Sequence, residues 1–281
     1  MRSIQVLRHG HVNQFARNYD HVLNFYRTVF DADVFLEFEE PDFGGKNAVY
    51  VAGAACFELF APTNPDMAIG ASIARFGERW HSLEWTVPNL DEAINIVTER
   101  GIRITDRSPG NYIFVHPRDC HGLCLELTTH FFNNDPRDAV DFDSVKGVNS
   151  NPLALIGGPI ITMVSSDAQE SIAWVADFTG RTSDSTHQGT RANAHAINFG
   201  DHVIEYVTPN QSESDKELHT QITTHGASMF SVTLPVRDLD HAQRELERHN
   251  LAVAIVPSAP VPLLALDLKQ TDGARLQFMQ A

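Results

Sequence analysis

The 281-residue sequence lacks several features that assign proteins to broad classes. No stretch approaches the roughly 18 consecutive apolar residues of a membrane-spanning helix, and the N-terminal MRSIQVLRHGHVNQ has no apolar signal-peptide core. Lys and Arg number 21 against 36 Asp and Glu, which gives a net charge of −15, and they form no cluster. We therefore expect a soluble, cytoplasmic protein with no membrane and no nucleic-acid partner.

Cysteine is also scarce. Cys56, Cys120 and Cys124 are odd in number and lie within or beside predicted strands. Two neighbouring cysteines without further Cys or His partners do not make a zinc knuckle, so the spacing predicts buried, reduced thiols.

What the sequence does contain is an internal repeat. The sequence pattern of residues 18–33 is repeated at 167–184, and that of residues 80–101 is repeated at 229–250. Each pattern is typical of a strand followed by an amphipathic helix, or of part of such a unit. The offset between the copies is about 149 residues. A length of 281 residues also favours roughly two domains.

The polar residues are not repeated with the pattern. At the same offset His11 falls on Ile160 and His81 on Phe230. With a two-residue slip, Glu58 falls on Glu205 and Glu126 on Gln277. A duplicated fold with donor side chains concentrated in one copy predicts one working site and one that has been lost.

Periodicity divides the chain into four units, each a strand, a helix and further strands. The predicted elements are strand 3–15, helix 19–30 and strands 34–38, 47–51 and 55–60; strand 80–87, helix 90–100 and strands 102–105, 112–116 and 122–128; strand 160–164, helix 169–178 and strands 194–199 and 202–208; and strand 229–236, helix 239–249 and strands 252–256, 263–268 and 275–279. The turn-rich stretch between units two and three indicates a linker.

Four such units resemble the vicinal oxygen chelate superfamily, which includes glyoxalase I, methylmalonyl-CoA epimerase and the extradiol dioxygenases. WHSLEWTVPNLDEAINIVTERGIRI with FVHPRDCHGLCLEL is similar to the second module of the epimerases, and GHVNQFARNYDHVLNFYRTVFDA with CFELFAP to a first module. The resemblance implies an α+β fold of four βαβββ modules in two half-barrel domains, residues 1–132 and 154–281, joined by linker 133–153.

The resemblance also implies a metal site. It places ligands on the first and last strands of the first two modules, at His11, Glu58, His81 and Glu126. Two imidazoles and two carboxylates suit one divalent ion, Zn²⁺, Fe²⁺, Mn²⁺, Co²⁺ or Ni²⁺. Glutamates in the apolar strands CFELF and LCLEL would need a partner if they point inward, although each alone is compatible with a solvent-facing residue.

Other polar residues are weaker candidates. His9 is two residues from His11, so it is expected on the same strand face as a supporting group or an alternative ligand. Tyr112, His116 and His121 surround the HPRD turn and could face a substrate or be surface residues. Glu37, Glu39 and Glu40 lie near the position where the epimerases carry a catalytic carboxylate, but the sequence does not select among them.

Three functions remain open for a small-molecule substrate. The first is a metal-dependent lyase, isomerase or epimerase, with Glu126 or Glu58 as general base and Tyr112 and His116 as further catalytic candidates. The second is an Fe(II) ring-cleaving dioxygenase that uses His11, His81 and Glu126. The third is a non-catalytic binding protein of the resistance type. A fourth ligand favours the first function, in a monomer or homodimer, while the substrate is not identifiable because no basic cluster indicates CoA or glutathione.

Overall fold

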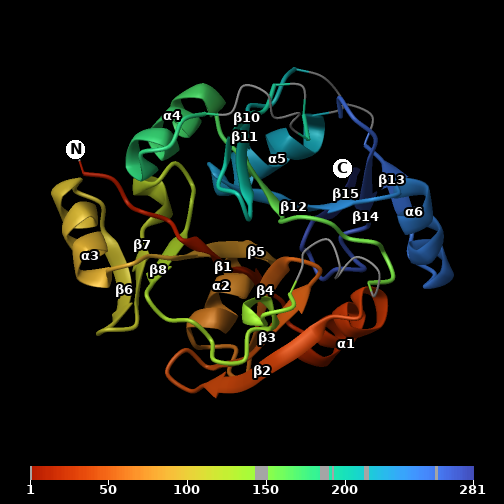
Figure 1. The fold of residues 1–281 in the computed structure, drawn as a ribbon, viewed down its shortest axis with the longest axis horizontal. Helices are drawn as coiled ribbons and strands as arrows, with labels where there is room; N and C mark the ends of the chain where they lie inside the picture. Colours follow the sequence, from red (N-terminus) through yellow and green to blue (C-terminus); the bar gives the residue numbers. More distant parts are fainter. Residues whose placement is uncertain (1, 143–150, 184–189, 192, 212–214, 257–258) are drawn as a thin grey trace.

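The computed structural model describes residues 2–142, 151–183, 190–191, 193–211, 215–256 and 259–281. Two curled sheets lie next to each other, with α1, α3, α4 and α6 around the periphery (Figure 1). The predicted α+β fold of paired half-barrels is confirmed. No helix in the described residues is long and apolar enough to cross a membrane.

The first sheet contains eight strands in the order β2-β3-β4-β1-β5-β8-β7-β6. Its elements are β1 (Arg8–Phe15), α1 (Tyr19–Phe30), β2 (Asp33–Glu40), β3 (Gly45–Ala52), β4 (Ala55–Pro62), α2 (Ala68–Phe76), β5 (Arg79–Thr86), α3 (Leu90–Glu99), β6 (Ile104–Ser108), β7 (Tyr112–Val115), the 3-10 turn η1 (Pro117–Asp119) and β8 (Leu125–Thr128). The antiparallel pair β1–β5 lies at the centre of the sheet. β4 pairs parallel with β1 on one side, and β8 pairs parallel with β5 on the other.

The second sheet contains seven strands in the order β10-β11-β9-β12-β15-β14-β13. After the 3-10 turn η2 (Pro136–Asp138), its elements are β9 (Ile160–Val164), α4 (Ala168–Thr179), β10 (His195–Asn198), β11 (Val203–Val207), α5 (Lys216–His225), β12 (Ser228–Val236), α6 (Leu239–Arg248), β13 (Val253–Ile255), β14 (Leu263–Leu266) and β15 (Leu276–Gln280). The third unit has two described strands after its helix where the others have three. The domain and linker boundaries remain predictions, and linker residues 143–150 lie outside the described residues.

Local sequence explains where the helices begin and end. Asn89 caps α3 by accepting a hydrogen bond from the backbone N–H of Glu92 at 3.0 Å. Gly101 follows the same helix with a φ of 70°, a conformation that favours glycine. The short helices α2 and α5 were not predicted.

The two sheets are built with the same strand register. Asn13 on β1 lies opposite Glu58 on β4, and Thr162 on β9 lies opposite Glu205 on β11. Glu84 on β5 lies opposite Glu126 on β8, as Thr233 on β12 lies opposite Gln277 on β15. Equivalent positions therefore carry carboxylates in the first sheet and mainly hydroxyl and amide groups in the second.

The sheets pack closely against each other. Gly122, before β8, has a φ of 92°, and a Cβ there would lie 2.4 Å from the backbone of Ala227. The indole of Trp80 donates to the carbonyl of Arg275 at 2.9 Å. One hydrophobic core cluster contains residues of both sheets.

Candidate metal centre

His11 on β1 is the centre of a buried cluster of carboxylates. Its Nε2 lies 2.9 Å from Glu58 Oε2 and 3.8 Å from Glu126 Oε2. Its Nδ1 lies 3.6 Å from Glu84 Oε1. All four residues, which we name the His11 cluster, are buried. Neither ring nitrogen makes a well-directed hydrogen bond, so both are available to a further partner.

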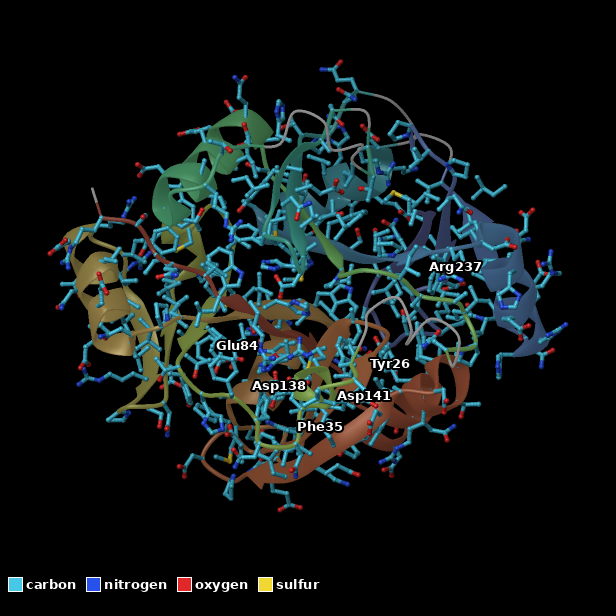
Figure 2. All side chains as sticks on the ribbon, viewed as in Figure 1. Tyr26, Phe35, Glu84, Asp138, Asp141 and Arg237 are labelled. Carbon is cyan, nitrogen blue, oxygen red and sulfur yellow. The ribbon has the colours of Figure 1, made fainter. Side chains whose placement is uncertain are left out.

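The sheet register brings these side chains together. β1 and β5 are neighbours, and the flanking β4 and β8 supply Glu58 and Glu126. Gly10 provides the space for Glu84, because a Cβ at Gly10 would lie 1.7 Å from Glu84 Oε1. Glu84 lies well inside the molecule (Figure 2).

Burial and mutual repulsion make the cluster electrostatically unfavourable by itself. Burial raises the pKa of Glu84 to about 8; His11 opposes this shift, and Glu126 and Glu58 add to it. Burial also raises the pKa of Glu126. Burial opposes protonation of His11, but the facing carboxylates outweigh it and hold the pKa of the imidazole well above its usual range. Three carboxylates around one imidazole leave negative charge that a divalent cation would neutralise.

The donors fit such an ion. His11, Glu84 and Glu126 each offer a ligand atom, and the three atoms lie within 4.8 Å of one another. Glu58 contacts His11 from β4 and completes a mixed N/O set. The sequence analysis did not predict Glu84 as a ligand. Its sequence context, LEW, is nevertheless the same as for Glu58 and Glu126, because each is an acidic residue in an apolar strand.

The structure does not bring His81 into the His11 cluster. Its ring stacks on Phe15, with 4.0 Å between centroids and 5° between planes, and its Nδ1 lies 2.9 Å from Ser82 Oγ. His81 and Phe15 line the same cavity as the His11 cluster, but the pairing of β1 with β5 is irregular here. Asn13 lies opposite Ser82 and Gln14 opposite Trp80, which leaves His81 as the extra residue of a bulge. Ser82 accepts a hydrogen bond from Asn13 Nδ2 at 2.7 Å. Burial lowers the pKa of His81 to about 3.

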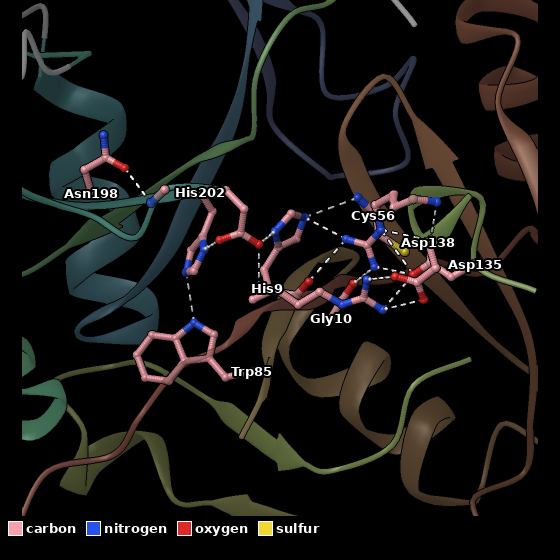
Figure 3. A network of polar contacts seen from close by, with 12 residues as sticks. His9, Gly10, Cys56, Trp85, Asp135, Asp138, Asn198 and His202 are labelled. Atoms are coloured by element: carbon pink, nitrogen blue, oxygen red, sulfur yellow. Dashed lines mark hydrogen bonds and ion pairs between the residues drawn. The ribbon is translucent and has the colours of Figure 1, made fainter. Parts of the chain in front are cut away.

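His9 does not share the environment of His11. The register of β1 against β5 shifts between His9 and Val12, and this irregularity overrides simple alternation. His9 Nδ1 contacts Asp201 Oδ2 at 2.7 Å, and its Nε2 lies 3.2 Å from Arg137 Nη1 (Figure 3). The expectation that both histidines line one site is therefore corrected: His9 belongs to a network between the sheets.

That network is satisfied internally. Asp201 Oδ1 contacts His202 Nδ1 at 2.7 Å, and the indole of Trp85 donates to His202 Nε2 at 3.0 Å (Figure 3). Arg137 donates to the carbonyls of His9 and Gly10 and pairs with Asp135. His9, Asp201 and His202 are close enough to hold an ion, but their hydrogen bonds already explain their positions.

A cavity of about 880 Å³ opens over the His11 cluster. Tyr112 and His116 line it, in agreement with a substrate-facing position. Glu40 lines it as well, and burial, with repulsion from Glu58 and Glu126, raises the pKa of Glu40 to about 7.

The remaining sequence candidates do not line this cavity. The carboxylate of Glu37 accepts hydrogen bonds from the Tyr19 hydroxyl at 2.7 Å and from Arg27 Nη2 at 2.9 Å. Glu39 is exposed. His121 faces helix α4, where its Nδ1 lies 3.2 Å from Ser171 Oγ.

In the second sheet, hydroxyl groups surround Glu205, the residue equivalent to Glu58. The buried Glu205 accepts hydrogen bonds from Thr162 Oγ1 at 2.7 Å and from the backbone N–H and side chain of Thr190. Phe230 and Ile160 stand where His81 and His11 stand in the first sheet, and neither side chain offers a donor atom.

Solved structures of similar shape include two enzyme types. A triple mutant of 4-hydroxymandelate synthase from Streptomyces coelicolor has a TM-score of 0.64 at 10% identity, covering 98% of this chain and 92% of that chain. The chain has the vicinal oxygen chelate fold. A methylmalonyl-CoA epimerase variant from S. coelicolor, in complex with 2-nitronate-propionyl-CoA, has 26% identity and a TM-score of 0.40, covering 44% of this chain and 96% of that one.

The epimerase from Mycobacterium tuberculosis has 23% identity and a TM-score of 0.41, covering 46% of this chain and 91% of its own. No family model and no curated protein matches the sequence. On the vicinal oxygen chelate fold, His11, Glu58 and Glu126 meet as the resemblance implied, while Glu84 is added and His81 lies apart.

Proposed function

We propose that this protein is a divalent-metal-dependent lyase, isomerase or epimerase acting on a small molecule that carries a carbonyl beside another oxygen. The observation that carries the proposal is the His11 cluster at the base of a large cavity. His11, Glu84 and Glu126 would hold the ion, with Glu58 as a further ligand. When bound, the ion would act as a Lewis acid that stabilises negative charge on substrate oxygen.

Glu40 is the best-placed group to move a proton. Its carboxylate lines the cavity and makes no hydrogen bond or ion pair with other described residues, so it is not held in another role. A pKa of about 7 suits a general base at neutral pH. Glu58 and Glu126, the bases expected from the sequence, face His11 and suit ion binding better.

The ligand set favours this class over a dioxygenase. A two-histidine, one-carboxylate iron site needs a second imidazole, and His81 is stacked on Phe15 instead. Three carboxylates around a single imidazole also provide an oxygen-rich set that suits Mn²⁺ and similar ions as well as Fe²⁺.

The test separates the reaction classes. Protein reloaded with Mn²⁺, Co²⁺, Ni²⁺, Zn²⁺ or Fe²⁺ is incubated in D₂O with 2-oxo-hemithioacetals, acyl-CoA thioesters and catechols, while substrate loss, deuterium uptake and oxygen uptake are followed. We expect oxygen-independent exchange or isomerisation with more than one metal. Oxygen-coupled ring opening with Fe²⁺ alone would replace this proposal with the dioxygenase, and metal binding without turnover of any substrate would favour the binding protein.

Glu40→Gln tests the assigned base within the same assay. We expect it to keep the metal and to lose at least about a hundredfold in exchange rate, within the usual contribution of general base catalysis. Glu39→Gln, at the exposed neighbouring position, is the matched control and should leave the rate unchanged. Equal rates in the wild type and Glu40→Gln would remove Glu40 from the mechanism.

A further inference from the structure

One arginine in the cavity lining, Arg79, has no acidic partner among the described residues. Arg79, the first residue of β5, lines the cavity beside α2. Its Nη1 donates to the carbonyl of Gly77 at 2.8 Å, and its Nη2 donates to Ser72 Oγ at 2.9 Å. The guanidinium lies over Phe15 and Phe76, at 5.5 and 5.1 Å from the ring centroids. These contacts hold its orientation.

Arg79 makes no ion pair with any residue that the structure describes. Burial lowers the pKa of Arg79 to about 10, so the side chain still carries its charge at neutral pH. Two of its five N–H groups are used by Gly77 and Ser72, and the others are available. A partly buried cation without a counter-ion is costly, which favours an anion on a ligand.

Several aromatic side chains form part of the cavity wall. Phe15, Phe43, Phe60, Trp80 and Phe132 all line it. Arg79 and Glu84 are five positions apart on β5, which corresponds to roughly 16 Å of extended strand between their Cα atoms. An elongated ligand with an apolar middle matches this spacing.

We propose that Arg79 binds a carboxylate of the substrate, and that the substrate is an elongated aromatic acid whose opposite, oxygen-bearing end reaches the His11 cluster. The inference rests on the proposed function for that opposite end only. Arg79 is then the residue that selects acids over neutral analogues, and the aromatic walls select ring-containing molecules.

The test compares an acid with its neutral analogue by isothermal titration calorimetry, using 4-phenylbutanoate and 4-phenylbutanamide as probes. In metal-loaded wild-type protein we expect the acid to bind about tenfold more tightly, the effect of one charge-assisted pairing. Arg79→Gln should abolish this preference, and Arg79→Lys should keep part of it. Arg107→Gln, at an exposed arginine of β6 that does not line the cavity, should leave it unchanged.

Metal binding is separated from anion binding by His11→Ala. If Arg79 holds the carboxylate, the preference survives in His11→Ala, whatever happens to the metal. Loss of the preference in His11→Ala with retention in Arg79→Gln would show that the carboxylate binds the ion, and would overturn the inference. Equal binding of acid and amide to the wild type would overturn it as well, while leaving the metal and the proton transfer of the proposed function untouched.

Discussion

Gly10 determines whether the carboxylate of Glu84 can reach His11. A methyl group at residue 10 would occupy the space of Glu84 Oε1, only 1.7 Å away. We therefore expect Gly10→Ala to weaken binding of Mn²⁺ by about tenfold or more, within the range seen when groups around a metal are displaced. Calorimetric titration of Mn²⁺ measures this effect.

Gly101→Ala is the control for Gly10→Ala. Gly101 has a φ of 70° and open space around its Cα, so alanine there should cost about 1 kcal/mol of folding free energy without changing metal affinity. Unchanged Mn²⁺ affinity in Gly10→Ala would show that Glu84 is not needed for the site.

Single residues also mark where sequence reasoning was insufficient. The joint occurrence of His11, Glu58 and Glu126 in apolar strands indicated a cluster, and the structure brings these three together. His81 lies at an irregularity in the pairing of β1 with β5, and its ring stacks on Phe15 instead of meeting His11. The sequence does not show the strand irregularity near His9 or the space at Gly10, because both depend on pairing with β5.

At the scale of elements, the His9–Asp201–His202 network joins β1 to the turn between β10 and β11. Burial lowers the pKa of His9 to about 4. Burial would raise the pKa of Asp201, but hydrogen bonds from His202 and His9 outweigh it and hold the pKa of this carboxyl well below its usual range. Both groups therefore resist protonation in the folded state.

This network predicts how stability depends on pH. The unfolded chain takes up a proton on His9 near pH 6.5, whereas the folded chain does so only near pH 4. His9 should therefore lower the free energy of unfolding by roughly 3 kcal/mol at most as pH falls from about 6.5 to 4, and Asp201 should lower it further below pH 4. His81, whose pKa is also lowered, adds to the same fall. Urea denaturation at a series of pH values measures the slope.

His9→Gln should flatten the slope between pH 6.5 and 4, since the amide does not titrate. His195→Gln, at an exposed histidine of β10, is the control and should leave the slope as in the wild type. The same slope in His9→Gln and the wild type would show that other groups determine the acid response.

The main helices and strands were predictable because they combine regular periodicity with caps such as Asn89. Helices α2 and α5 were missed for local reasons. AIGASIARF contains a glycine in its first turn, and KELHTQITTH is polar with β-branched residues near its end, so propensity alone does not indicate a helix. Tertiary packing stabilises α2, where Ile69 and Ile73 join a small apolar cluster with Phe15.

At the scale of the whole molecule, two sheets of equivalent register have different interiors. In the first, His11 and three carboxylates face one another; in the second, Glu205 is held by Thr162 and Thr190. The offset of about 149 residues pointed to this asymmetry from the sequence. The packing of the sheets, through contacts such as Trp80 with Arg275, was not predictable because it joins residues far apart in the chain.

The most direct test of the account is metal content measured on five proteins prepared without chelator. Elemental analysis after loading with Mn²⁺ should find about one ion per chain in the wild type, in His81→Ala and in Glu205→Gln. His11→Ala and Glu126→Gln should lose most of it, with affinity reduced by more than about a hundredfold, because removal of a direct ligand exceeds the effect of a supporting residue. Full metal content in His11→Ala, or its loss in His81→Ala, would contradict the account.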